Sequence, residues 1–176
     1  MTLSSNVDLR KDIQCIRYLR RTGFNLIDSD RSERTKFMLK GIWTVGVKVP
    51  NLERELDYHR ALGNEVVLDE KLELDGEFFR LPLIKVGDKY THIAEKMVYE
   101  AFLDDPLPCG ITHLVYVTTD FDADRKRAVE AGAVEFHEPV EASAEFGRRR
   151  VAFLKTPSGY VVEYIDIIEN LVPEVV

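Results

Sequence analysis

The chain has 176 residues and 45% apolar side chains, and its 24 Lys and Arg against 31 Asp and Glu give a formal net charge of −7. This length suits one domain, or two small halves that share a core, and is too short for several independent domains. The negative charge argues against a nucleic-acid binder that relies on attraction to phosphate. No apolar run approaches the roughly 20 residues that a membrane-spanning helix needs.

The cysteines and the first residues indicate the compartment. Cys15 and Cys109 form no disulfide framework, and neither lies in a CxxC motif, so reduced thiols are expected. Residues 1–6 lack the basic and apolar pattern of a signal peptide. Both features indicate a cytoplasmic protein.

Residues 1–40 form an N-terminal extension with a net charge of +4, whereas the rest of the chain carries −11. Leu9, Ile13, Ile16 and Leu19 recur at helical spacing, which predicts an amphipathic helix over 8–22. A basic amphipathic helix can bind an acidic membrane surface. The apolar stripe is narrow, which favours packing on the acidic body or on a second subunit.

The remainder, 41–176, contains the same order of elements twice: a strand, a helix and three further strands. In the first unit, 42–100, they are expected at 42–49, 51–63, 64–67, 78–85 and 90–99. In the second unit, 111–168, they are expected at 111–117, 120–132, 133–136, 148–155 and 160–168. Each βαβββ unit is too small to bury both faces of its sheet, so we expect the two to pair in one α+β fold.

The final hairpin carries the most specific motif. Residues 147–164 read GRRRVAFLKTPSGYVVEY, two apolar strands joined by a Pro-Ser-Gly turn. Together with 43–49 and 112–117, this segment resembles the vicinal-oxygen-chelate superfamily, which includes glyoxalase I, extradiol ring-cleaving dioxygenases, methylmalonyl-CoA epimerase and bleomycin-resistance proteins. The resemblance covers about 42–168 and implies that the two units form cupped mixed sheets.

The resemblance also implies where a metal ion would bind, and the matching positions are Thr44, His92, His113 and Glu163. Thr44 stands where metalloenzymes of the superfamily carry His, Gln or Glu, and its neutral hydroxyl is a poor ligand. Matching the turns places Ile93 opposite Glu163, but an apolar Ile93 suits the helix-covered side, so His92 is expected in the cup. The predicted metal site is therefore His92, His113 and Glu163.

This set resembles the 2-His-1-carboxylate triad that holds non-haem Fe(II) and leaves positions for substrate and O2. It favours a ring-cleaving dioxygenase acting on a small substrate with vicinal oxygens. A glyoxalase- or epimerase-type lyase or isomerase, using Zn, Ni, Co or Mn as a Lewis acid, is one alternative. A metal-free binding protein like the bleomycin-resistance proteins, with an acidic and aromatic-lined cleft for a cationic ligand, is the other.

Other side chains could contact a substrate. Tyr116 and Tyr160 are candidate catalytic residues, although tyrosines in strands are commonly core or boundary residues. Along 148–150 the arginines alternate between faces, so one or two could enter the cup, where a buried arginine would suit an anionic substrate; a solvated hairpin is the alternative. The expected partners are a small-molecule substrate and a second copy of the chain in a homodimer, with no nucleic acid and no membrane.

Overall fold

The computed structural model describes residues 39–74 and 76–173. The chain divides into two units, residues 1–36 and 37–176, and all described residues belong to the second. The predicted helix over 8–22 and Cys15 lie outside the described residues, so the N-terminal extension stays a prediction. No helix within the described ranges is long and apolar enough to cross a membrane.

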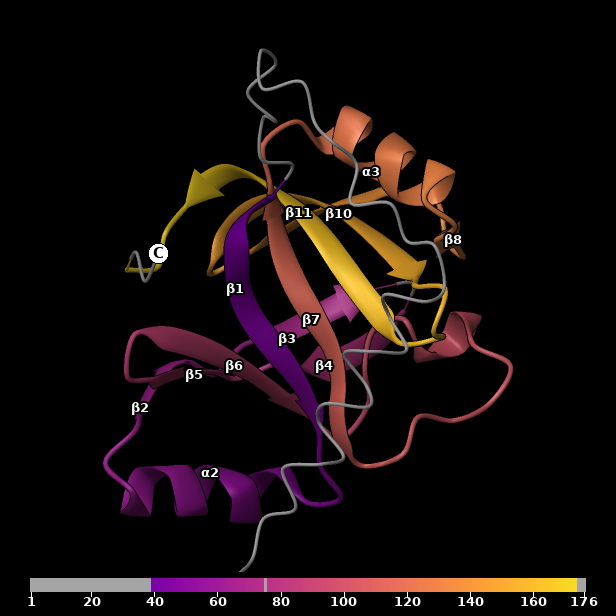
Figure 1. The fold of residues 1–176 in the computed structure, drawn as a ribbon. Coiled ribbons are helices and arrows are strands. Elements are labelled where there is room, and N and C mark those ends of the chain that lie inside the picture. Colours follow the sequence, from indigo (N-terminus) through magenta and orange to yellow (C-terminus); the bar gives the residue numbers. More distant parts are fainter. Residues whose placement is uncertain (1–38, 75, 174–176) are drawn as a thin grey trace, which may run out of the picture. The chain divides into compact units, whose positions relative to one another are not determined.

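The described residues form eleven strands, two α-helices and one 3-10 helix (Figure 1). The first half consists of β1 (Leu39–Lys48), α2 (Leu52–Ala61), β2 (Glu65–Leu68), β3 (Lys71–Leu74), β4 (Glu77–Arg80), β5 (Leu83–Val86) and β6 (Lys89–Ala94). The second half consists of η1 (Glu100–Phe102), β7 (Gly110–Thr118), α3 (Phe121–Glu130), β8 (Val134–Glu135), β9 (Val140–Ala144), β10 (Gly147–Lys155) and β11 (Val161–Asn170).

The main sheet repeats one connection twice. Its strand order is β2-β5-β6-β1-β7-β11-β10-β8, with β9 also paired to β10, while β3 and β4 form a separate two-stranded sheet. In each half the first strand is parallel to the last strand, β1 to β6 and β7 to β11. The halves join where β1 runs antiparallel to β7. The predicted α+β fold of two βαβββ units is therefore confirmed.

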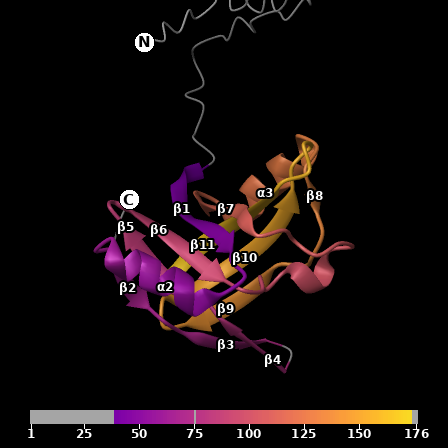
Figure 2. The same cartoon turned by 90° about the horizontal axis from the view of Figure 1, so that it is seen from below.

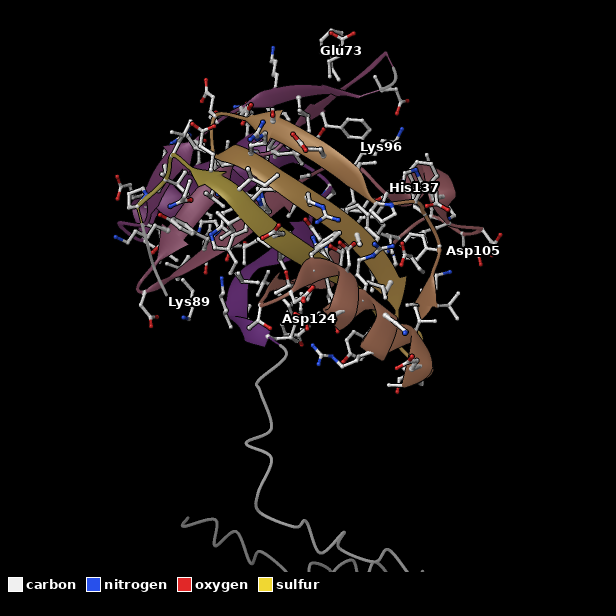
Figure 3. All side chains as sticks on the ribbon, turned by 90° about the horizontal axis from the view of Figure 1, so that it is seen from above. Glu73, Lys89, Lys96, Asp105, Asp124 and His137 are labelled. Atoms are coloured by element: carbon white, nitrogen blue, oxygen red, sulfur yellow. The ribbon has the colours of Figure 1, made fainter. Side chains whose placement is uncertain are left out.

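Both helices begin at a side chain that caps the first turn. Asn51 accepts a hydrogen bond from the Arg54 N–H at 2.9 Å, and Asp120 accepts one from the Ala123 N–H at 3.2 Å, as expected of these residue types. Inside α3, Asp124 is fully buried and accepts hydrogen bonds from the backbone N–H groups of Thr119 and Asp120 (Figure 3). The first turn of α3 is thus fixed to the strand that precedes it.

Two segments of the first half differ from the prediction. The strand expected over 78–85 is divided, because Pro82 has no N–H for a ladder hydrogen bond; residues before it form β4, and β5 begins at Leu83. The strand expected over 90–99 ends at Ala94, after which the chain turns into η1. Strands β3 and β9 have no counterpart among the predicted elements. The division matters because Leu81, directly before Pro82, lines a cavity and no residue of β5 does.

Each helix covers its own half of the main sheet (Figures 1 and 2). The cavity lies on the other face, because its lining residues include Trp43 and Phe153 of the cluster that the helices do not cover. Helix α2 packs against Ile84 and Ile93, and α3 packs against Leu154 and Val162. A third apolar cluster, which includes Trp43, fills the opposite face of the sheet. Side chains that alternate along a strand therefore point either to a helix or to the interior of the cup.

Candidate functional site

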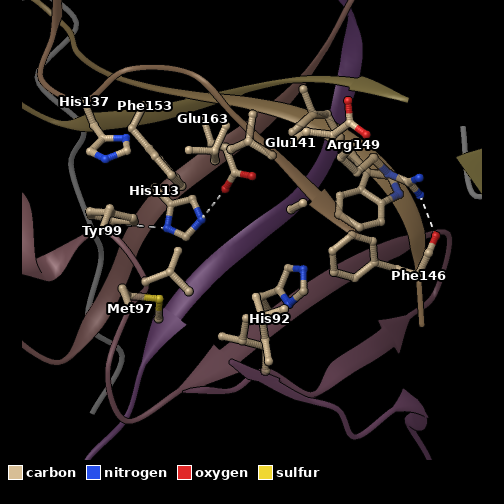
Figure 4. A pocket seen from close by; sticks show the side chains of 18 of the residues that line it. His92, Met97, Tyr99, His113, His137, Glu141, Phe146, Arg149, Phe153 and Glu163 are labelled. Carbon is tan, nitrogen blue, oxygen red and sulfur yellow. Dashed lines mark hydrogen bonds and ion pairs between the residues drawn. The ribbon is translucent and has the colours of Figure 1, made fainter. Parts of the chain in front are cut away.

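The inner face of the sheet encloses a cavity of about 300 Å³, at the small end of the range for ligand sites. Its wall is mainly apolar and aromatic, with contributions from both halves (Figure 4). The polar side chains on the wall are His92, Tyr99, His113, His137, Glu141, Arg149 and Glu163. A site of this size and lining suits a small molecule with an apolar body.

The sheet register explains how residues distant in sequence meet on this wall. Gly46 on β1 pairs with His92 on β6 and with His113 on β7. Paired residues project to the same face of a sheet, so the two imidazoles stand on either side of Gly46. On β11, Val161 pairs with His113 and Glu163 with Val115. Glu163 therefore lies diagonally next to His113, on the strand away from His92.

His113 and Glu163 are in direct contact. His113 Nε2 lies 3.2 Å from Glu163 Oε2, and both side chains are largely buried. The other ring nitrogen, Nδ1, lies 3.1 Å from the Tyr99 hydroxyl and 3.0 Å from Thr112 Oγ1. Burial raises the pKa of Tyr99 well above its usual value, so its hydroxyl keeps its proton. When Tyr99 donates to Nδ1, the proton of the neutral ring sits on Nε2, next to the carboxylate.

His92 points into the cavity, and Ile93 points to α2, in the orientation expected from the strand. The His92 ring meets Trp43 edge-on, with ring centroids 5.7 Å apart. Its Nδ1 is buried and has no hydrogen-bond partner in the described part of the chain. Burial, reinforced by the nearby His113, lowers the pKa of His92 to about 3. The imidazole is therefore neutral at ordinary pH.

The predicted metal site is only partly assembled. His113 and Glu163 meet, but β1 separates them from His92, and no three His, Cys, Asp or Glu side chains of the described residues are grouped so as to hold a metal ion. Thr44 is fully buried and its Oγ1 has no partner among the described residues, but it offers only a neutral hydroxyl. A bound transition metal normally has three or four protein ligands. The residues present do not fit such an ion.

The two tyrosines predicted to be catalytic lie elsewhere. Tyr116 packs edge-on against Tyr164, at 6.0 Å between ring centroids, next to the cluster under α3. Tyr160 is exposed in the turn before β11. Neither lines the cavity, because the side chain of Tyr116 leaves β7 on the helix-covered face. Tyr99 takes the position beside His113 instead. Alternation along the strand predicted over 90–99 would place Tyr99 on the face of Ile93, but β6 ends at Ala94 and Tyr99 lies in the turn that follows.

Arg149 lies buried in the cavity wall, where the sequence left open a solvated hairpin. Its terminal nitrogens donate hydrogen bonds to the Phe146 carbonyl at 2.9 Å, to Asn170 Oδ1 at 2.7 Å, and to the carbonyls of Arg148 and Glu169. Before Arg149, strand β9 ends at Ala144 and β10 begins at Gly147, so the turn between these two strands lies within residues 143–147. Glycine at 147 adopts a positive φ in that turn.

No protein-family model matches the sequence, and no curated protein matches it. Solved structures are similar in fold. A methylmalonyl-CoA epimerase in complex with methylmalonyl-CoA and NH4+ has 22% identity and a TM-score of 0.58, over 77% of this chain and 99% of that one. The epimerase from Mycobacterium tuberculosis has 22% identity and a TM-score of 0.55, over 78% of this chain and 95% of that one. The Mn(II)-bound glyoxalase from Novosphingobium aromaticivorans has 16% identity and a TM-score of 0.53, over 76% of this chain and 40% of that one.

Fold and site together define a duplicated βαβββ scaffold around a small-molecule cavity. These structures show the fold that the final hairpin predicted: the chain has the paired βαβββ fold that the two methylmalonyl-CoA epimerases and the glyoxalase also have. None of the three similar proteins above is a ring-cleaving dioxygenase, so the expectation of an Fe(II) dioxygenase gains no support from them.

Proposed function

We propose that the protein is an isomerase of the epimerase kind, which moves a proton at a carbon next to a carbonyl group. Glu163 is the base in this proposal, and His113 positions it. The observation that carries the proposal is the contact between these two side chains, at 3.2 Å, on the wall of a largely apolar cavity. The likeness of the fold to two methylmalonyl-CoA epimerases supports this choice among the functions of the superfamily.

The chemistry follows from the positions of the two carboxylate oxygens. His113 faces Oε2, which leaves Oε1 of Glu163 for the substrate. The C–H bond breaks, its electron pair moves into an enolate, and the proton passes to Glu163. Return of the proton from Glu163 to the same face restores the original C–H bond, whereas inversion requires that a water molecule protonates the planar carbon from the opposite face while Glu163 passes its proton to solvent.

Deuterium exchange tests the proposal directly. The protein is incubated with methylmalonyl-CoA in D2O, and incorporation at the carbon between the two carbonyl groups is followed by proton NMR. We expect Glu163→Gln to lower the exchange rate by at least about a hundredfold, as is typical for loss of a general base. Glu130→Gln is the matched control, since Glu130 is an exposed residue of α3. Exchange that persists in Glu163→Gln, or that is absent from the wild type, contradicts the proposal.

The same preparations test whether the proposed reaction takes place without a bound metal ion. Protein purified without added metal is analysed by mass spectrometry for Mn, Fe, Co, Ni and Zn. One equivalent of a divalent metal in the wild type that is lost in His113→Ala would place a cation at His113 and Glu163. That result would restore the predicted metal centre and would contradict proton transfer by Glu163 acting as a free base.

A further inference from the structure

Arg149 is a buried positive charge that forms no ion pair with any carboxylate of the described residues, and the Glu169 carboxylate acts on it only at longer range. Its side chain is 1% exposed, and its guanidinium carbon lies 5.4 Å from the ring centroids of both Trp43 and Phe146. Within the described residues no carboxylate forms an ion pair with it, because its acceptors are three backbone carbonyls and the amide oxygen of Asn170. Burying an unpaired charge is costly, so this arrangement is that of a site that receives an anion.

The hydrogen bonds of Arg149 leave one donor free. Both terminal nitrogens are used, and they hold the guanidinium fixed against the Trp43 and Phe146 rings. The Nε atom is buried and has no partner among the described residues. Arg149 also lines the cavity. The cavity wall therefore carries a positive charge with one N–H donor that has no partner among the described residues.

The carboxylates on the same wall do not neutralise this charge. Glu163 is paired with His113, and Glu141 lies 3.6 Å from the guanidinium of Arg148. Next to Trp43, His92 is a neutral imidazole and adds no charge of either sign. The unpaired charge of the described wall is thus the cation of Arg149.

We infer that Arg149 is the specificity-determining residue of the cavity, and that it binds a carboxylate of the ligand next to Trp43. The inference rests on the proposed function in one respect, which is that the ligand is also the substrate. In that case the carboxylate bound by Arg149 fixes the orientation in which the reacting carbon meets Glu163. Charge-assisted hydrogen bonds in a buried site are strong enough to select an anion over its neutral analogue.

Trp43 provides the measurement, because it is the single tryptophan of the chain and contacts Arg149 directly. Binding of phenylacetate, phenylacetamide and phenethylamine is followed by the fluorescence of Trp43 at one ionic strength. The three probes have similar size and differ in charge. We expect phenylacetate to bind at least about tenfold more tightly than the amide, and the amine to bind most weakly.

Two variants locate the effect. Arg149→Gln is expected to bring the affinities for phenylacetate and phenylacetamide within about twofold, whereas Arg149→Lys, which keeps the charge, retains part of the preference. Arg150→Gln is the matched control: it removes the same charge from the next residue, which faces away from the cavity and pairs with Asp122 at 2.9 Å. We expect it to keep the full preference for the anion.

Equal affinities for the acid and the amide in the wild type would overturn the inference, and so would a preference that survives in a folded Arg149→Gln. Because Arg149 also links β10 to β11, circular dichroism is used to verify that each variant is folded. If Arg149→Gln is unfolded, the comparison of probes on the wild type and on Arg149→Lys tests the inference. Preference for the amine would overturn the inference in favour of a binding protein for cations. These probes report binding alone. If the protein prefers the anion but catalyses no deuterium exchange, only the proposed function is contradicted. If it catalyses exchange but does not prefer the anion, only this inference is contradicted.

Discussion

Gly46 on β1 lies directly against the imidazole of His113 on β7, and the ring occupies the space that a β-carbon at position 46 would fill. The backbone carbonyl of Gly46 also accepts a hydrogen bond from the Thr112 hydroxyl at 3.1 Å. The glycine is required here for space, since its φ lies outside the left-handed range. Its absent side chain lets His113 lie flat across β1 and reach Tyr99 and Glu163.

Gly46→Ala is therefore expected to displace the His113 ring. We expect a loss of about 1–3 kcal/mol in the free energy of unfolding, as for other overpacked buried sites, and a fall of at least about tenfold in the exchange rate. Urea denaturation and the deuterium assay measure the two effects. Adding His113→Ala to Gly46→Ala removes the clash, so the two stability losses should be less than additive. Full additivity would show that the methyl group and the ring do not compete for the same space.

Tyr99→Phe tests the positioning of the ring from its other side. Loss of the hydroxyl removes the hydrogen bond to His113 Nδ1 without emptying the cavity wall. We expect kcat for exchange to fall roughly tenfold, the equivalent of one buried hydrogen bond, while KM changes by less than about twofold. Tyr90→Phe is the control, because the Tyr90 hydroxyl donates to the Pro173 carbonyl and the residue does not line the cavity. A change confined to KM would contradict a positioning role for Tyr99.

His92 makes stability depend on pH. Its pKa is about 3 in the folded protein against 6.5 for a free histidine side chain, so between these values the unfolded chain binds a proton that the folded chain does not. The contribution of neutral His92 to the free energy of unfolding is therefore fully present above about pH 6.5. It falls as the pH is lowered, by up to roughly 1.4 kcal/mol per pH unit. Urea denaturation at pH 5 to 7 should show a shallower decline for His92→Gln than for the wild type. Parallel curves would contradict a buried neutral imidazole.

Asp124 is expected to contribute to stability through the first turn of α3. Burial by itself would raise the pKa of Asp124, but hydrogen bonds from backbone N–H groups and from Arg127 hold it below the usual value. Asp124→Asn should lower the free energy of unfolding by about 1–3 kcal/mol near pH 7. This loss should become smaller as the pH falls below about 4, because the wild-type carboxylate is then protonated. Asp122 lies in the same turn and its side chain is largely exposed. Asp122→Asn should therefore lower the free energy of unfolding by less than about 1 kcal/mol. Equal costs for the two variants would contradict this account.

The repeated elements were predictable because local rules fix them. Asn51 and Asp120 are strong helix caps, and strand alternation correctly assigned His92 to the cavity and Ile93 to α2. Pro82 cannot donate a ladder hydrogen bond, and it lies between β4 and β5. These features depend on residues near one another in the sequence.

The arrangement of the site depends on strand order, which spacing alone does not give. His92 in the first half matches Glu163 in the second, but β1 lies between the strand of His92 and that of His113, so only Glu163 reaches His113. Tyr99 enters from a turn, where no alternation applies. For Arg149, alternation indicated that one arginine of the run could face inward, but its burial depends on the Phe146 and Glu169 carbonyls, which the turn and β11 bring to it.

The two halves of the sheet share a backbone pattern and differ in chemistry. Thr44 and His92 in the first half stand where the second half has His113 and Glu163, and only the second pair is in contact. The two halves of the cavity wall therefore share a backbone arrangement but are chemically different, with a proton acceptor on one side and no equivalent on the other. A ligand turned end for end would meet a different wall, so duplication of the framework supplies one reaction centre instead of two.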